Sequence, residues 1–189
     1  KDLLIITPEN WDLDLYVIEE EDGLLTSIVH TFRQMIGRSY IPPKWAFGYG
    51  QSRWGYKTEE DIREVAAKYK EADMPLDAIY LDIDYMEQYE DFTVSEEKFP
   101  DLPRLAADMK KQGIHLVPII DAGVKIKEGY SVYEEGLEKG YFCKEEDGTP
   151  FVGAVWPGRA HFPDMLNPDA RRWFGMKYKD HRLPIERLR

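Results

Sequence analysis

Three aspartates stand where short apolar runs end, and carboxyl groups at such places can bind ligands or transfer protons. Asp82 and Asp84 close one apolar run, and Asp121 closes the next. If residues 82–84 are extended, the two neighbouring aspartates project to one face and Ile83 projects to the other. Two carboxylates on one face raise each other's pKa, which suits acid–base chemistry or cation binding. Hydrogen bonds to backbone amides or contact with solvent explain the same residues equally well.

Two tryptophans, Trp54 and Trp156, fall in loops after candidate strands, where packing in a core explains them less well than elsewhere. Flat aromatic faces beside carboxylates suit neutral polyhydroxylated ligands, although they also pack long surface loops. No two histidines have the i, i+4 spacing of a metal site, Cys143 has no cysteine partner, and no P-loop or dinucleotide fingerprint is present. We therefore expect no metal site and no cofactor, while a metal hydrolase that uses the three aspartates stays open as an alternative.

The elements that must position these residues alternate between short apolar runs and helical patterns. Apolar runs at 45–50, 78–83 and 115–120 predict buried strands, and the spacing between them predicts helices that begin near Thr58 and Pro103. This alternation implies parallel strands with right-handed crossovers, so the expected class is α/β. Periodicity alone leaves an open sheet and a closed barrel possible, and the carboxylates at strand ends favour the barrel.

The flanking regions predict further elements. We expect short strands at 3–6, 13–18 and 152–156, a one-faced helix from Asp22 to Gly37, and a last helix that begins at Asn167-Pro168. Pro42 and Pro43 can continue neither a helix nor a strand ladder, which predicts a domain boundary there.

Charge and composition exclude some classes of partner. The 189 residues include 36 acidic and 25 basic side chains, a formal net charge of −11. This field repels phosphate backbones and anionic lipids, so we expect no nucleic-acid partner. No run approaches the roughly 20 apolar residues of a membrane span, and no signal-peptide pattern is present, so we expect no membrane partner. A lone cysteine favours a reducing compartment, and the expected location is cytoplasmic.

Several motifs occur in a characteristic order between residues 42 and 175. They are Pro42-Pro43-Lys44-Trp45-Ala46-Phe47-Gly48, Arg53-Trp54-Gly55-Tyr56, Asp82-Ile83-Asp84-Tyr85-Met86, Ile119-Ile120-Asp121 and Val155-Trp156-Pro157-Gly158. Together they resemble glycoside hydrolase family 31, which contains α-glucosidases and α-xylosidases. The resemblance implies a (β/α)8 TIM barrel and a retaining hydrolase that releases terminal α-linked glucose, with one aspartate as nucleophile and a second as acid/base.

By matching position, the resemblance also implies roles for individual residues. Five residues would line the sugar pocket: Trp54, Asp82, Ile83, Ile120 and Trp156. In that pocket Asp82 would hydrogen-bond the sugar hydroxyls, Ile83 would pack against the ring, and Trp54 would contribute most to specificity. Three further residues would support them from behind: Asp84, Tyr85 and Asp121.

One motif of the family is missing. Its nucleophile stands in a Trp-x-Asp-Met-Asn-Glu motif that this sequence lacks, so no residue here is assigned as catalytic. A full barrel takes about 250 residues, and only three or four strand–helix units are expected here. The resemblance implies the end of a β-sandwich with a linking helix at 1–40, the N-terminal part of the barrel at 41–179, and a foreign or disordered tail at 180–189.

Two functions remain open at this point. The first is a truncated α-glucosidase-type hydrolase that holds part of the sugar pocket and is inactive alone. The alternative is a non-catalytic carbohydrate-binding or self-assembling half-barrel. Both take a small sugar or oligosaccharide as partner, and exposed barrel edges would promote self-association.

Overall fold

The computed structural model describes residues 14–180. Its contacts divide the chain into two compact units, and the division falls between Ile41 and Pro42. The assignment of residues 1–40 to the end of a β-sandwich stays a prediction. The strand expected at 3–6 and residues 181–189 of the tail expected at 180–189 lie outside the described residues. Asp180, the first residue of that tail, is the last residue of a helix.

The first unit contains helix α1 (Leu25–Ile36), which confirms the predicted one-faced helix. Asp22 accepts hydrogen bonds from the backbone N–H of Leu24 and the hydroxyl of Ser27, and Gly37 ends the helix with a φ of 90°. None of the helical residues is buried within the chain. The part of the expected strand 13–18 that the structure describes forms no regular strand.

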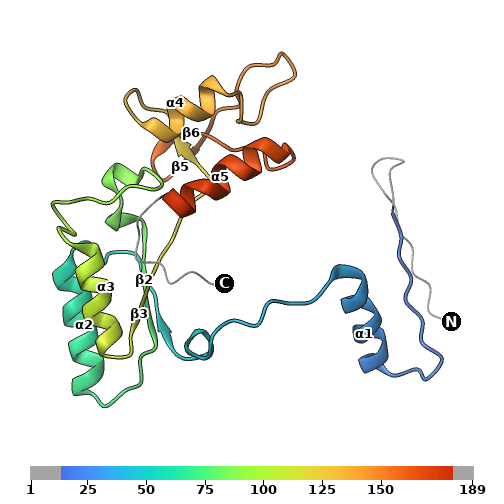
Figure 1. Cartoon of the computed structure of the whole chain (residues 1–189), viewed down its shortest axis with the longest axis horizontal. Helices are drawn as coiled ribbons and strands as arrows, with labels where there is room; N and C mark the ends of the chain where they lie inside the picture. Colours follow the sequence, from blue (N-terminus) through green and yellow to red (C-terminus); the bar gives the residue numbers. More distant parts are fainter. Residues whose placement is uncertain (1–13, 181–189) are drawn as a thin grey trace. The chain divides into compact units, whose positions relative to one another are not determined.

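The second unit begins with a parallel sheet covered by two helices (Figure 1). The strands, in spatial order, are β1 (Gly50–Gln51), β2 (Ala78–Leu81) and β3 (His115–Pro118), and both pairings are parallel. Helix α2 (Glu59–Glu71) connects the first two strands, and helix α3 (Leu102–Lys111) connects the last two. The predicted alternation of strands and helices, and with it the α/β class, is confirmed.

Local sequence explains where these two helices begin. Thr58 accepts a hydrogen bond from the backbone N–H of Asp61, and the Asp61 carboxylate accepts one from the Thr58 N–H, so α2 starts at a complete capping box. Asp101 caps α3 in the same way through the N–H of Arg104. The apolar faces of both helices then pack on β2 in one core, whose largest fully buried members include Ile62, Ile79, Leu81, Leu105 and Met109.

The strand expected at 45–50 is wrong over most of its length. Residues Lys44–Phe47 form a short 3-10 helix, and only Gly50 and Gln51 pair with β2. An apolar run of this length does not distinguish a buried strand from a helical turn. The chain also passes too close to Asp77 for an ordinary strand residue at Gly48, where a Cβ would lie 2.1 Å from the Asp77 Oδ2.

An antiparallel sheet follows the parallel one. Its spatial order is β4 (Val124–Lys125), β6 (Gly158–His161) and β5 (Gly153–Val155), accompanied by helices α4 (Ser131–Glu138) and α5 (Pro168–Asp180). The hairpin β5–β6 confirms the strand predicted at 152–156 and carries Trp156 in its turn. Asn167 caps α5 as predicted, since its Oδ1 accepts the N–H of Asp169 at 2.9 Å.

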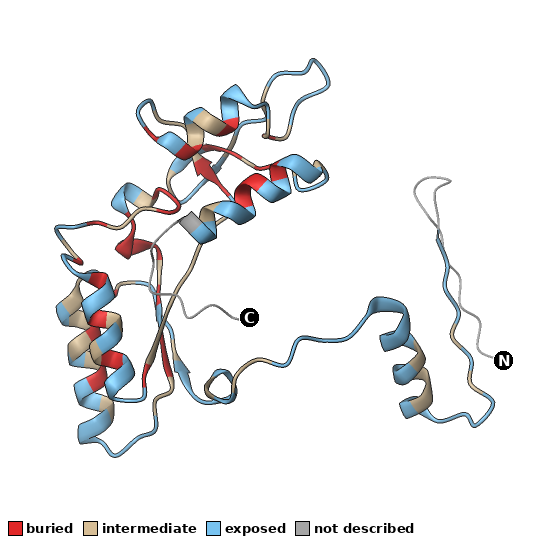
Figure 2. Ribbon diagram, in the orientation of Figure 1, coloured by how far each residue is buried: buried red, intermediate tan, exposed pale blue. Residues whose placement is uncertain are grey.

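Burial in the second unit follows these two layers. Figure 2 shows buried residues along the sides of α2 and α3 that face the parallel sheet and along α4 and α5. A second core joins the antiparallel sheet to its helices: Phe92, Val124, Tyr130, Val132, Phe142, Trp173 and Phe174. Between residues 14 and 180, no helix has both the length and the apolar character needed to cross a bilayer.

Close packing in this second core predicts that Gly136 in α4 resists substitution. A Cβ at this position would lie 2.4 Å from Cζ of Phe142 and 2.8 Å from Cη2 of Trp173. Gly136→Ala should therefore lower the free energy of unfolding by about 1–3 kcal/mol, because overpacking outweighs the gain in helix propensity. Urea denaturation followed by circular dichroism measures this change.

Gly175→Ala in α5 is the matched control. A Cβ there meets nothing within 4 Å, so the substitution should raise the free energy of unfolding by up to about 1 kcal/mol. If both variants are stabilised alike, the close contact at Gly136 does not exist in solution.

Candidate functional site

A cavity of about 450 Å³ lies beside the carboxyl ends of β1 and β2. Five side chains line it: Trp54, Asp82, Ile83, Tyr89 and Trp156. This volume is within the range of about 300–1,000 Å³ that small-molecule sites occupy. Four of the five residues expected to line a pocket thus meet around one space, although they come from positions up to 102 residues apart in the chain (54 to 156). Their role in binding sugar stays a prediction.

Ile120 is the expected lining residue that the structure places elsewhere. It follows β3 by two residues and does not line the cavity. Its partly buried side chain packs against both hydrophobic cores. Ile120 therefore lies between the two layers of the unit and supports the region behind the cavity.

The backbone after β2 turns earlier than an extended chain would. Asp82 begins a short 3-10 helix, η2 (Ile83–Tyr85), and its Oδ1 accepts the N–H of Ile83 at 2.7 Å. The extended backbone under which Asp82 and Asp84 would share one face is absent here, because side chains rotate by about 120° per residue in such a turn rather than 180°. Asp82 and Ile83 consequently both reach the cavity, while Asp84 points into the protein and is 3% exposed.

Asp84 and Tyr89 contact each other behind the lining. The Tyr89 hydroxyl donates to Oδ1 of Asp84 at 3.4 Å, whereas Oδ2 of Asp84 has no hydrogen-bond partner among the described residues. Burial, followed by the charge of Asp84, raises the pKa of the Tyr89 hydroxyl. Tyr89 therefore keeps its proton and presents its ring to the cavity. Nothing in the sequence pattern marked this residue.

Two further carboxyl groups lie near the end of β3. The backbone N–H of Asp121 donates to Oδ1 of Asp91 at 3.0 Å. Burial, followed by the charge of Asp82, raises the pKa of Asp121. Burial also raises the pKa of Asp91 from 3.8 to about 7, against the effect of the hydrogen bond from Asp121. Asp91 is 1% exposed, and its Oδ2 has no partner among residues 14–180.

Two tyrosines tie these segments together. Tyr85 is fully buried, and its hydroxyl donates to the carbonyl of Ile119 at 2.8 Å, which joins η2 to the end of β3. The hydroxyl of Tyr130 donates to the carbonyl of Asp91 at 2.7 Å. The role of Tyr85 as a support for a sugar pocket stays a prediction, and Asp91 and Tyr130 had no assigned role.

The described residues offer no metal centre. Within residues 14–180, no group of three or more His, Cys, Asp or Glu side chains could hold a metal ion. The metal hydrolase considered above needs Asp82, Asp84 and Asp121 on one site, and the inward direction of Asp84 removes that arrangement.

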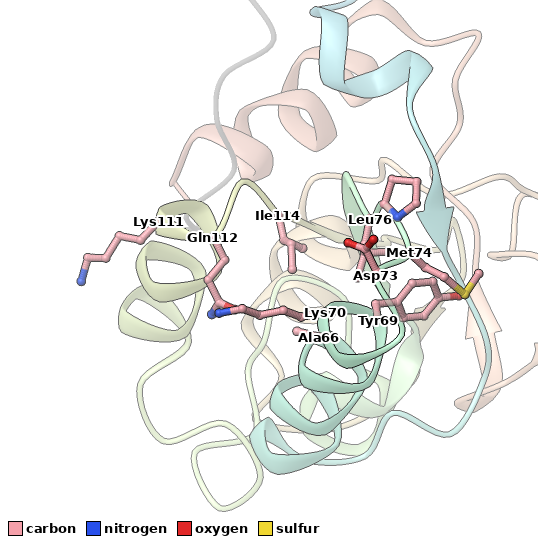
Figure 3. A pocket seen from close by; sticks show the side chains of 10 residues that line it. Ala66, Tyr69, Lys70, Asp73, Met74, Leu76, Lys111, Gln112 and Ile114 are labelled. Carbon is pink, nitrogen blue, oxygen red and sulfur yellow. The ribbon is translucent and has the colours of Figure 1, made fainter.

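A second cavity, of about 550 Å³, lies at the other end of the parallel sheet (Figure 3). Its lining comes from the last turns of α2 and α3 and from the segment before β2. Lys70 and Lys111 stand on its rim, where positive charge stabilises the negative ends of the helix dipoles. Because parallel α/β sheets, open or closed, bind ligands at the carboxyl ends of their strands, this cavity at the opposite end is not the candidate site.

Several known proteins are similar to this chain in sequence. Residues 39–187 match the family model described as "Glycosyl hydrolases family 31 TIM-barrel domain". Alpha-glucosidase 2 of Bacillus thermoamyloliquefaciens is 47% identical over 152 residues, which cover 80% of this chain and 19% of that protein. Lysosomal alpha-glucosidase of Mus musculus is 33% identical over 165 residues, covering 86% and 17%. The chain spans about a fifth of the length of these relatives.

Solved structures share the fold. The Tris-bound glucosidase II alpha subunit matches with a TM-score of 0.81 and 33% identity over 87% of this chain and 18% of that one. A family 31 alpha-xylosidase from a soil metagenome, complexed with xylose, matches with a TM-score of 0.69 and 27% identity over 77% and 21%.

The raised pKa of Asp91 predicts an unusual dependence of stability on pH. The folded chain favours the neutral Asp91 carboxyl, so the contribution of this group to the free energy of unfolding should fall as pH rises from about 4 to about 7. Asp91→Asn keeps an oxygen for the N–H of Asp121 but cannot ionise. The stability of this variant relative to the unsubstituted chain should therefore increase over that range by on the order of a few kcal/mol, measured by urea denaturation.

Asp108→Asn serves as a control of opposite sign. Hydrogen bonds from Lys111 and Arg63 lower the pKa of Asp108, so its stabilising effect is present at neutral pH and lost on acidification. This variant should lose stability relative to the unsubstituted chain as pH rises. If the profile of Asp91→Asn runs parallel to that of the unsubstituted chain, Asp91 titrates normally.

Proposed function

The chain belongs to glycosyl hydrolase family 31, and from that premise we propose that it supplies part of the sugar pocket of a retaining α-glucosidase-type hydrolase. The observation that carries the proposal is the cavity where one carboxylate and three aromatic rings meet. A pyranose has apolar C–H faces and a rim of hydroxyls. Aromatic walls bury the faces, and the carboxylate accepts hydrogen bonds from the rim.

Asp82 is well prepared to bind hydroxyls. Its Oδ1 is held by the N–H of Ile83, which fixes the side chain and leaves Oδ2 for a ligand. A hydrogen bond from a sugar hydroxyl to an ionised carboxylate contributes about 1.5–3 kcal/mol. Ile83 lies beside it with an apolar side chain that suits the ring of the same sugar.

Asp82 lacks the second carboxyl group in the cavity lining that cleavage of a glycosidic bond requires. Retaining glycosidases use two carboxyl groups about 5–5.5 Å apart, one as nucleophile and one as acid/base. Among the five side chains that line the cavity, Asp82 alone is acidic. In this proposal the chain binds α-linked glucose and does not cleave it without groups beyond the described lining.

A second candidate function is a non-catalytic carbohydrate-binding half-barrel that associates with itself. The exposure of the cavity walls favours it, since Trp54 is 64% and Trp156 is 71% exposed. Within the described sheet, β1 and β3 also pair on one side only, and unpaired strand edges promote association. A cytoplasmic location stays a prediction that rests on the lone Cys143.

Removal of one charge tests the sugar site. Asp82→Asn keeps the shape of the side chain but replaces the carboxylate, so the affinity for glucose should fall by about 10- to 100-fold. Nuclear magnetic resonance of the tryptophan indole N–H groups follows the titration, because Trp54 and Trp156 line the cavity. Asp169→Asn, which changes an exposed carboxylate on α5, should bind glucose normally. Equal affinities in the two variants remove Asp82 from the site.

An assay for hydrolysis of p-nitrophenyl α-glucoside tests whether this chain alone is an active enzyme, which neither candidate function predicts. We expect the purified chain to release no p-nitrophenol, because the cavity lacks a carboxyl pair. Release that persists in Asp82→Ala contradicts the proposed division between binding and cleavage. Light scattering on the same sample then shows whether a stable oligomer accompanies sugar binding, as the second candidate requires.

A further inference from the structure

Tyr89 reaches the cavity from a strained turn rather than from a strand end. Gln88 and Tyr89 have φ values of 48° and 62°, which lie in the left-handed region. Residues other than glycine adopt this backbone at a cost, and they keep it only where surrounding contacts hold it. The turn Glu87–Tyr89 therefore needs specific partners.

Two lysines supply these partners from the antiparallel sheet. The Lys125 ammonium donates to the carbonyl of Gln88 at 3.1 Å and to its Oε1 at 3.3 Å. The Lys127 ammonium donates to Oε1 of Glu90 at 2.6 Å, and Glu90 is 5% exposed. Lys125 belongs to β4, and Lys127 follows it by two residues. The turn is thereby attached to β4 on both sides of Tyr89.

The antiparallel sheet also carries Trp156, another aromatic residue that lines the cavity. Strand β4 pairs with β6, and the turn between β5 and β6 holds Trp156. The residues that line the cavity are therefore positioned by two different sheets. Asp82 and Ile83 come from the parallel sheet, whereas Tyr89 and Trp156 depend on the antiparallel one.

We propose that Tyr89 is a specificity-determining residue whose ring contacts the sugar unit next to the one that Asp82 holds, so that the cavity prefers an α-linked disaccharide to free glucose. This inference rests on the proposed function. The Tyr89 hydroxyl donates a hydrogen bond to the buried Asp84, so the ring is the part of Tyr89 that is left to contact a ligand in the cavity. A ring face binds by burying a pyranose face, and the Asp82 side of the cavity already takes the first unit.

Two substitutions at one position test the role of the ring. Tyr89→Gly deletes the ring and should fold readily, because glycine adopts a φ of 62° without strain. Tyr89→Phe keeps the ring and loses only the hydrogen bond to Asp84. Glucose and maltose are titrated into each variant of the 189-residue chain, with the indole signals of Trp54 and Trp156 as readout.

The unsubstituted chain should bind maltose more tightly than glucose. Tyr89→Gly should lower the affinity for maltose by about tenfold more than it lowers the affinity for glucose, while Tyr89→Phe keeps the preference. An equal loss for both sugars, an unchanged affinity for maltose, or a Tyr89→Phe variant that behaves like Tyr89→Gly overturns the role of the ring and leaves the proposed function standing. If the unsubstituted chain binds neither sugar, both proposals fall.

Discussion

Parallel pairing of three short strands is the constraint on which the candidate site depends. Leu81 lies opposite Pro118, so the chain leaves β2 and β3 at the same edge of the sheet. Asp82 follows one strand directly, and Asp121 follows the other closely enough that the charge of Asp82 raises its pKa. A slip of register by one residue would turn these side chains to the other face. The helical core on α2 and α3 stabilises this register and contributes no side chain to the cavity.

Two buried carboxyl groups behind the cavity are energetically unfavourable. Asp84 and Asp91 are each nearly inaccessible to solvent, and each has one oxygen without a partner among the described residues. Burial of polar groups that lack partners is costly, and it is tolerated most often near functional sites. Hydrogen bonds from Tyr89 and from the backbone of Asp121 offset part of the cost. The same bonds fix the segments on which the lining residues stand.

Much of the fold could be predicted from local patterns, whereas the detailed lining could not. The capping box at Thr58 and the helical spacing after it locate α2 because both signals are local. The sequence predicts a shared face for Asp82 and Asp84 only if the backbone is extended, and it carries no signal for the 3-10 turn that begins there instead. Tyr89 carries no sequence signal, since its left-handed turn depends on Lys125 and on other residues distant in the chain. Interactions between segments distant in the chain therefore determine which side chains line the cavity, and the periodicity of the sequence does not reveal them.

The attachment of the turn at Tyr89 has a consequence for how the molecule responds to ionic strength. The Glu90 side chain is 6% exposed, and it faces the side chains of Lys125, 19% exposed, and Lys127, 37% exposed, so dissolved ions reach the Glu90 carboxylate poorly. Electrostatic attraction between solvent-exposed charges weakens with added salt, but attraction between shielded charges changes little. The turn that carries Tyr89 should thus keep its position between low and high salt concentration. Exposed ion pairs such as Arg172 with Asp169 should weaken over the same range.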